Sequence, residues 1–436
     1  MDSGALDTLV ARARAAQRSV SELPLGERLE RARRAGEAIA AAGEDIVAHA
    51  VAEARQPVRF ARRELTTALG FVAALPALAE EIRPRRVPAV SGETTLEWAP
   101  YGVVLGWHAA NSPVWVPTLV ALSALVGGNA AVCRPSSRVP RTSSRVLEAI
   151  AGEWLEDAVQ VAALSRDEAE PLVWHEGVDA VVAHASSETC KRHFALLGEA
   201  YARGARLRPY IPEGSGNDAF VVLAGAPPER VAAALATAAF ANSGQLCMAA
   251  KRVIVLEELW PALRGPLAEA VAALRVGPPE REDTDVAPLG PGRALERGRA
   301  DLAEALAAGG RIVAGGGERD GVLTPTVVEL AREDRDVRLW REESFGPVRS
   351  LVLARDEDEA VALANETRFG LGAAVFGGRE GVAARLRGAR IVVEEGPLYQ
   401  DPHLVVGGVG DSGLGGARPK LEQLVYARRV HRGGGG

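Results

Sequence analysis

Lysine is scarce in this 436-residue chain, although basic residues are not. Of the 51 basic residues, the lysines are Lys191, Lys251 and Lys420. Pyridoxal phosphate chemistry, which needs a Schiff-base lysine, is therefore disfavoured unless one of these lysines is buried in a site.

Cysteine is equally rare, and Cys133, Cys190 and Cys247 form no C-x-x-C pair. Three cysteines are too few for a disulfide framework, so we expect a reduced, cytoplasmic setting. The seven histidines show no H-x-x-x-H spacing, and the sequence predicts no metal site. His108, three residues before Asn111, is expected to form part of a pocket wall.

The chain also lacks an excess of basic charge and an unbroken apolar segment. Its 51 basic and 57 acidic residues give a net charge of −6, which offers no general attraction for a phosphate backbone. The uncharged stretch from Tyr101 to Cys133 is divided by Pro113, Pro117 and a Gly-Gly-Asn turn. We therefore expect no nucleic-acid partner, no membrane span and no signal peptide.

The order of apolar segments predicts an α/β protein. Helices are expected over the first eighty residues and a hairpin over 85–98. From Gly102 onward, short apolar runs alternate with helical segments, which is typical of βαβ units with a largely parallel sheet. The same alternation after Ala219 indicates a second α/β unit. Residues 276–320 are rich in Gly, Pro, Glu and Arg, and turns are expected at Gly309-Gly310 and at Gly315-Gly316-Gly317.

The stretch from Asn242 to Cys247 (NSGQLC) is the most informative candidate for chemistry. A cysteine that follows a glycine in a loop before a helix has its thiolate stabilised by the helix amides. The same amides donate to an oxyanion formed by attack on a carbonyl. Taken alone, such a cysteine is more often a small buried hydrophobe, so other motifs have to decide its role.

Six segments match, in order and near the expected spacing, the motifs of one enzyme superfamily. They are Asn111-Ser112-Pro113, Gly128 to Ser136 (GNAAVCRPS), Glu213, Gly244-Gln245-Leu246-Cys247, Glu342 to Pro347 (EESFGP) and Gly407 to Gly415 (GGVGDSGLG). Through these motifs the chain resembles the aldehyde dehydrogenase superfamily over nearly its full length.

The resemblance implies a Rossmann-like dinucleotide-binding domain over residues 1–212 and a second, catalytic α/β domain over 213–390. A C-terminal segment over 391–436 is expected to close over the active site. In this superfamily a hairpin, here residues 85–98, and the C-terminal strand form an oligomerisation arm. A homodimer or homotetramer is therefore expected.

The implied reaction is the oxidation of a small-molecule aldehyde to a carboxylic acid with NAD or NADP. Cys247 is expected to attack the aldehyde, forming a thiohemiacetal and, after hydride transfer to the nicotinamide, a thioester. The side chain of Asn111 and the Cys247 N–H are expected to hold the oxyanion. Glu213 is expected to activate water. Glu343 is similar to the residue that grips the nicotinamide ribose, and Phe345 to one that packs near the ring.

Four further residues are implied in cofactor binding: Arg134, Ser136, Ser137 and Ser186. Ser137 stands where many NAD-preferring members carry a glutamate, which would repel a 2′-phosphate. With Arg134 and Arg138 beside it, NADP is expected to be accepted at least as well as NAD. Cys190 replaces a glycine of the phosphate turn, and its side chain is expected to hinder close approach of a phosphate.

Three other functions remain open at this point. A CoA- or carrier-linked acyl reductase would run the thioester chemistry in reverse, although Glu213 favours hydrolysis. A non-catalytic scaffold that kept the fold is suggested by the changes at Ala185 and Cys190. A cofactor-free cysteine hydrolase ranks last, because no histidine partner for Cys247 is evident.

Overall fold

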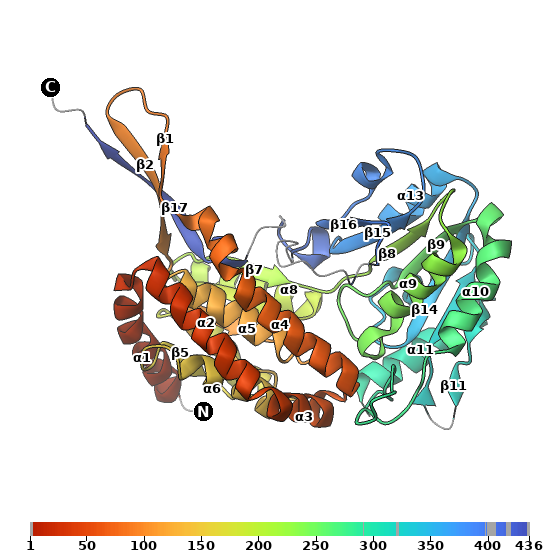
Figure 1. The fold of residues 1–436 in the computed structure, drawn as a ribbon, viewed down its shortest axis with the longest axis horizontal. Helices are drawn as coiled ribbons and strands as arrows, with labels where there is room; N and C mark the ends of the chain where they lie inside the picture. The colour runs from red at the N-terminus through yellow and green to blue at the C-terminus, as the bar shows by residue number, and fades with distance from the viewer. Residues whose placement is uncertain are drawn as a thin grey trace.

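The computed structural model describes residues 3–290, 292–319, 322–396, 398, 407–415 and 420–433. Two β-sheets, each covered by helices, form the two halves of the molecule, and a smaller sheet projects from the first half (Figure 1). The expected α/β class is therefore confirmed.

The first sheet has five parallel strands in the order β5-β4-β3-β6-β7. The strands are β3 (Val103–Trp107), β4 (Ala130–Arg134), β5 (Val159–Val161), β6 (Ala180–His184) and β7 (Tyr210–Glu213). The surrounding helices are α1 (Ser3–Glu22), α2 (Leu25–Ala41), α3 (Gly43–Ala54), α4 (Val58–Leu78), α5 (Trp115–Val126), α6 (Pro140–Ala151), α7 (Arg166–Ala169) and α8 (Ser187–Ala202).

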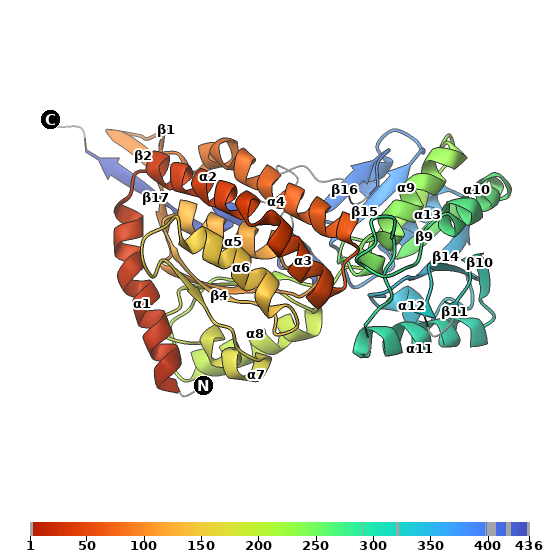
Figure 2. The same cartoon turned by 60° about the horizontal axis from the view of Figure 1, so that its bottom comes forward.

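Both faces of this sheet are apolar because helices cover both. Val104 and Ala131 join a core with α2, α4, α5 and α6, whereas Val103 and Leu105 join a core with α1 and α8. Figure 2 shows α5 and α6 on one side of β4 and α8 on the other. Parallel pairing therefore brings the carboxyl ends of β3, β4, β6 and β7 to one edge.

Helix α4 continues into a 3₁₀ turn, and the segment Val58–Ile82 is long and apolar enough to cross a membrane. It packs instead in the core of the first sheet, where Phe71, Leu75 and Leu78 are buried. The Phe71 ring meets the ring of Trp115 edge-on at 5.6 Å. The segment is thus a helix of the protein core, although its length and composition alone would also suit a membrane span.

The second sheet has seven strands in the order β10-β13-β14-β9-β8-β15-β16, parallel except for the β10–β13 pair. They are β8 (Ala219–Val222), β9 (Arg252–Leu256), β10 (Arg311–Gly315), β13 (Thr326–Leu330), β14 (Val348–Ala354), β15 (Gly372–Phe376) and β16 (Arg390–Val393). Its helices are α9 (Pro228–Phe240), α10 (Trp260–Ala272), α11 (Arg293–Ala307), α12 (Arg338–Arg341) and α13 (Glu357–Asn365), with a small β11–β12 hairpin (Glu318–Arg319, Val322–Leu323).

Helix α11 and strand β10 lie in the region 276–320, where the sequence analysis expected turns at the glycine clusters and assigned no helix. Gly309, Gly315 and Gly317 do have positive φ angles, as turns require. The helix buries Leu302 and Ala305 against the second sheet. Its interior glycine, Gly298, faces Leu323, where a Cβ would lie 2.7 Å from the leucine side chain. Glycine there allows close packing, and its presence disguised the helix in the sequence.

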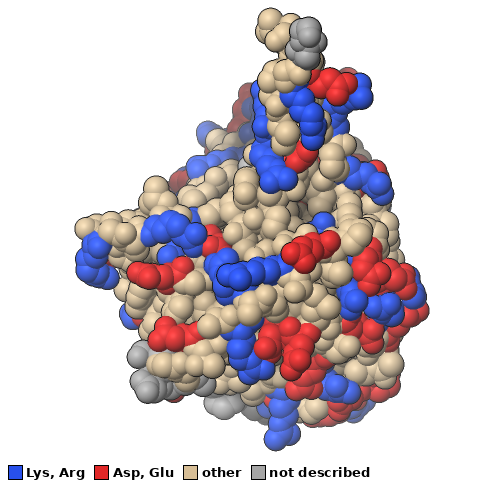
Figure 3. Space-filling model, turned by 90° about the vertical axis from the view of Figure 1, so that its left-hand side faces the viewer, with Lys and Arg blue, Asp and Glu red and all other residues tan. Residues whose placement is uncertain are grey.

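The projecting sheet is antiparallel and consists of β1 (Arg85–Val87), β2 (Glu93–Pro100) and β17 (Val425–Arg432). The expected hairpin is present, with Gly92 at φ 67° in its turn. Figure 3 shows the sheet standing clear of a face on which acidic and basic side chains are interspersed. A short helix, α14 (Lys420–Gln423), precedes β17 and lies against the first half of the molecule.

The expected domain boundary at residue 212 stays a prediction. Strand β7 ends at Glu213, and β8 opens the second sheet at Ala219. Within the expected closing segment, residues 399–406 and 416–419 lie outside the described residues.

Candidate active site

A cavity of about 690 Å³ lies between the carboxyl ends of the first sheet's strands and the amino ends of strands in the second. Such edges of parallel sheets are where open α/β proteins bind ligands. The residues expected from the sequence to be catalytic or to bind the cofactor all line this cavity: Cys247, Glu213, Asn111, Arg134, Ser136, Ser137, Ser186, Glu343 and Phe345.

The turn that carries Cys247 begins with three residues in the left-handed region. Asn242, Ser243 and Gly244 have φ angles of 51°, 57° and 77°. A Cβ on Gly244 would lie 2.1 Å from the carbonyl oxygen of Gly346, so only glycine fits there. The strained backbone is held by its surroundings and fixes the path of the chain into Cys247.

Asn111 is tied to this turn from the first sheet. Its Nδ2 donates to the carbonyl of Gln245 at 3.1 Å, and its own carbonyl accepts from Gln56 Nε2 and Asn242 Nδ2, both at 3.1 Å. The amide and the cysteine are therefore held in one network across the two halves of the molecule.

One expectation about Cys247 was wrong. The residue lies in a turn that leads into strand β9, not into a helix, so no helix amides stabilise its thiolate. Burial raises the pKa of the Cys247 thiol to about 11; the charge of Lys251 opposes this rise, while Glu343, Asp218 and Glu213 add to it. Ionisation of the Cys247 thiol must therefore be favoured by a group other than helix amides.

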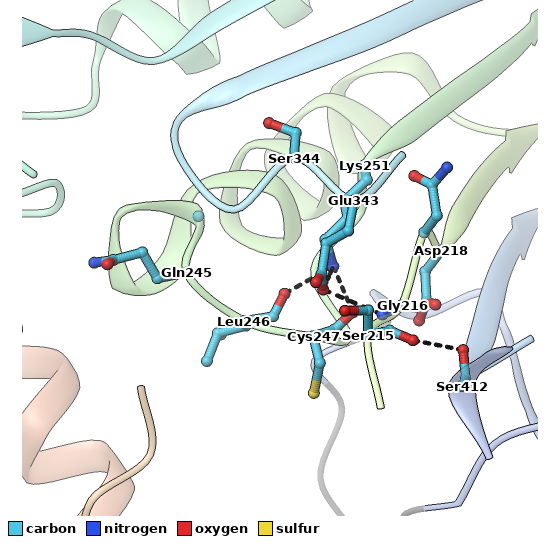
Figure 4. Close-up of polar contacts among 12 residues, drawn as sticks. Ser215, Gly216, Asp218, Gln245, Leu246, Cys247, Lys251, Glu343, Ser344 and Ser412 are labelled. Atoms are coloured by element: carbon cyan, nitrogen blue, oxygen red, sulfur yellow. Dashed lines mark hydrogen bonds and ion pairs between the residues drawn. The ribbon is translucent and has the colours of Figure 1, made fainter. Parts of the chain in front are cut away.

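Glu343 lies directly behind the cysteine turn (Figure 4). Its Oε1 accepts from the Gly216 N–H at 3.1 Å and lies 3.5 Å from Lys251 Nζ. A Cβ on Gly216 would lie 2.4 Å from the Cys247 carbonyl oxygen, so the two backbones pack in contact. This glycine lets Glu343 and Cys247 share one small volume.

Glu213, at the end of β7, is paired with Lys420 from α14. Lys420 Nζ donates to Glu213 Oε1, and both side chains are almost fully buried. The second oxygen, Oε2, is buried without a hydrogen-bond partner among the described residues, and Glu213 lines the cavity. One oxygen is thus held while the other remains available to a ligand.

Glu64, on α4, holds the start of α5 just after Asn111. Its Oε1 accepts from the N–H groups of Val114 and Trp115 at 2.9 and 2.8 Å, and its Oε2 accepts from Gln56 at 2.8 Å. Burial raises the pKa of this carboxyl from 4.5 to about 7. The network around Asn111 therefore contains a group that titrates near neutrality.

We expect Glu64→Gln to flatten the pH dependence of stability. The folded carboxyl binds its proton more tightly than the unfolded one, so its contribution to stability is full below pH 4.5 and is lost as the pH rises through about 7. At about 1.4 kcal/mol per pKa unit, the loss amounts to about 3 kcal/mol. Urea unfolding of both proteins from pH 5 to 8 measures it. Exposed Glu37→Gln is the control, and parallel curves for wild type and Glu64→Gln would contradict the assignment.

The far end of the cavity is rich in arginine. Arg134, which is 5% exposed, stacks on Trp107 with its guanidinium carbon 4.5 Å from the ring centroid. Burial, with Arg166 nearby, lowers the pKa of Arg134 to about 10. The other arginines that line the cavity are Arg63, Arg138, Arg166, Arg192, Arg293 and Arg297. The concentration of guanidinium groups suits an anionic ligand that carries several phosphates.

Cys190 does not obstruct this end. It is 4% exposed, packs in the core between α8 and the first sheet, and does not line the cavity. Ser186 caps α8 instead, with its Oγ accepting from the Thr189 N–H at 3.3 Å. The expected hindrance by the Cys190 side chain was therefore wrong.

Two buried histidines, His108 and His184, also line the cavity. Burial lowers the pKa of His108 to about 3 and holds that of His184 well below its usual range, so both rings are neutral. Across the described residues, no group of three His, Cys, Asp or Glu side chains is arranged to hold a metal ion.

Comparison with known proteins identifies the molecule's relatives. The aldehyde dehydrogenase family model matches residues 1–428. The chain belongs to the aldehyde dehydrogenase family. It is accordingly an NAD(P)-dependent oxidoreductase that acts on aldehydes.

Among its relatives, this aldehyde dehydrogenase is 30% identical to the succinate-semialdehyde dehydrogenase [NADP(+)] of Deinococcus radiodurans, over 98% of this chain and 90% of that one. The enzyme of the same name from Mycolicibacterium paratuberculosis is 32% identical over 73% and 68%. Of solved structures, the succinic semialdehyde dehydrogenase of Streptococcus pyogenes with NADP⁺ has a TM-score of 0.90 at 22% identity, over 100% of this chain and 96% of that one. It therefore supports the fold alone.

Lys251 and Lys420 are the site residues that sequence reasoning missed. Both lie in the interior, in contact with residues already singled out. The signal that was available is their rarity, since a chain that uses arginine for nearly all its basic positions has lysine at only three, and these are two of them.

Proposed function

We propose that this enzyme oxidises a small carboxylate-bearing aldehyde to the corresponding acid, with NADP as cofactor. The convergence of Cys247, Asn111 and Glu213 on one cavity carries the proposal. The ionised sulfur of Cys247 attacks the aldehyde carbon, and the Asn111 amide and the Cys247 N–H donate to the developing oxyanion. Glu213, held on one side by Lys420, accepts a proton from water through its other oxygen and so drives hydrolysis of the thioester.

The residues present fit a dinucleotide phosphate. The buried Nε of Arg134 has no hydrogen-bond partner among the described residues, and Ser136, Ser137 and Ser186 add hydroxyl groups along the same wall. Glu343 and Phe345 lie nearer Cys247, where they would hold the nicotinamide ribose and the ring. When bound, the nicotinamide accepts the hydride that leaves the aldehyde carbon.

The assigned roles predict distinct kinetic defects. Cys247→Ala should abolish formation of reduced cofactor, and Asn111→Ala should slow it by ~10²–10³ because an oxyanion donor is lost. Glu213→Gln should keep a rapid burst of one reduced cofactor per site, then turn over ~10²–10⁴ more slowly. Stopped-flow absorbance measures all three, and Cys190→Ala, outside the cavity, is the matched control. Turnover by Cys247→Ala at the parental rate would refute the proposal.

NADP preference follows from Ser137 and its arginine neighbours. Introducing a carboxylate by Ser137→Glu should lower kcat/KM for NADP roughly tenfold or more, about 1.4 kcal/mol, with a much smaller effect for NAD. Ser91→Glu, on the projecting hairpin, adds the same charge away from the cavity and should change neither value. A strong preference of the wild type for NAD, from kcat/KM with each cofactor, would contradict the assignment.

The aldehyde class is inferred from Arg63 together with the succinate-semialdehyde relatives. Phe60, one turn earlier on α4, packs with Leu246 and Met248 on either side of Cys247. Arg63 follows one turn later on the same helix and also lines the cavity. The apolar side chains next to Cys247 in sequence, together with the Arg63 guanidinium, suit a short aldehyde that ends in a carboxylate.

Arg63→Met should accordingly raise KM for succinate semialdehyde by ~10–100-fold, through loss of a charge-assisted hydrogen bond, and leave butanal unchanged. Steady-state kinetics with both aldehydes measures the difference. Arg62→Met removes a guanidinium that pairs with Glu282 on the outer face of the same helix, and it is the control. Equal loss with both aldehydes would place Arg63 outside substrate recognition.

Two further properties belong to this proposal. The projecting β1-β2-β17 sheet is proposed to pair subunits of a homodimer or homotetramer, because its strands stand clear of the molecule. A cytoplasmic location is inferred from three free cysteines. The alternative of an acyl reductase is disfavoured by Glu213, a cavity-lining carboxylate with one unpartnered oxygen among the described residues, because a base that activates water favours hydrolysis.

A further inference from the structure

Lys251 is a fully buried lysine directly behind the catalytic turn. It precedes strand β9 and has 0% side-chain exposure. Its Nζ donates to the carbonyls of Leu246 at 2.8 Å and Cys247 at 2.5 Å, and lies 3.5 Å from Glu343 Oε1 (Figure 4). These three partners account for the three N–H donors of an ammonium group.

The charges around Cys247 come from five elements. Carboxylates approach from the end of β7, the start of β8 and the segment after α12, as Glu213, Asp218 and Glu343. Cations approach from Lys251 before β9 and from Arg390 at the start of β16, whose Nη2 donates to Met248 Sδ at 3.6 Å. Three buried or half-buried carboxylates therefore oppose ionisation of the thiol, and a buried cation has to offset them.

Stability alone does not explain a lysine at this position. Burying an ammonium costs several kcal/mol, and replacing a buried ion pair by apolar side chains is often neutral or stabilising. The adjacent Arg252 shows what a structural cation does here: its guanidinium binds three backbone carbonyls, those of Asn217, Leu363 and Ala364. Lys251 instead places a compact charge against the turn that holds the reactive sulfur.

We propose that Lys251 is a positioning residue for Cys247, which draws the Leu246 and Cys247 carbonyls away from the cavity and stabilises the thiolate. The inference rests on the proposed nucleophilic role of Cys247. Ionisation breaks the S–H bond, the sulfur keeps the electron pair and the proton passes to solvent. Burial lowers the pKa of Lys251, and the charges of Glu343, Asp218 and the Cys247 thiolate oppose that change, so ionisation of the sulfur and protonation of the lysine favour each other.

The test measures thiol reactivity in the enzyme without aldehyde or cofactor. Iodoacetamide alkylation of Cys247, located by peptide mass spectrometry, is measured at pH 8, below the thiol pKa of about 11, where the rate follows the thiolate fraction. Lys251→Met should slow alkylation about tenfold or more, since a neighbouring opposite charge shifts a pKa by one unit or more. Lys251→Arg keeps the positive charge and should react clearly faster than Lys251→Met, whereas equal rates in the two variants would show a purely structural role and overturn the proposal.

A second comparison, between Glu343→Gln and the double variant, keeps the test valid if Lys251→Met alone misfolds. Glu343→Gln removes the carboxylate, so Lys251→Met in that background leaves no uncompensated buried charge. The double variant should still alkylate about tenfold more slowly at pH 8 than Glu343→Gln alone, and equal rates would show that Lys251 acts only by neutralising Glu343. Failure of the proposed function would show separately, as turnover by Cys247→Ala, because alkylation requires neither substrate nor cofactor.

Discussion

Loss of hydration at the junction of the two sheets is the constraint on which the active site depends. The groups needed for the chemistry lie where water is largely excluded, and burial works against the charged form of each. It raises the pKa of the Cys247 thiol to about 11 and lowers the pKa of His108 to about 3. The reactive groups are therefore usable only where a buried partner of opposite charge compensates.

Two lysines supply this compensation, and they do so from different parts of the chain. Lys251 lies four residues after Cys247 and reaches the sulfur's own turn, whereas Lys420 arrives from the C-terminal helix α14 and reaches Glu213 on the first sheet. Arginine, which is abundant elsewhere, is larger and binds through a planar fork. At Arg349 and Arg252 it is used to tie backbone carbonyls together, a structural task. Lysine and arginine are therefore used at different positions because their charged groups differ in shape.

The fold was largely predictable from the sequence because its strands are buried on both faces. Continuous apolar runs such as those of β3, β4 and β9 leave little doubt about strands, and intervening helices imply parallel pairing. Helix α11 escaped because its interior glycine and charged surface resemble a loop, although Leu302 and Ala305 anchor it. Local composition indicates only the intrinsic helix propensity of a segment. Helix α11 is stabilised instead by packing against residues that are distant in sequence, which its own composition does not indicate.

The sequence predicted which residues of the candidate site line the cavity, but it did not predict which charged groups surround each of them. Motif spacing placed Cys247, Asn111 and Glu213 in one cavity, as the structure shows. It did not show that Glu213 meets Lys420 across more than two hundred residues. Since environment sets how readily each group ionises, reactivity depends on contacts that spacing along the chain does not report. One such contact makes Glu213, the proposed general base, dependent on α14, so the proposed site is complete only when α14 is folded against the first sheet.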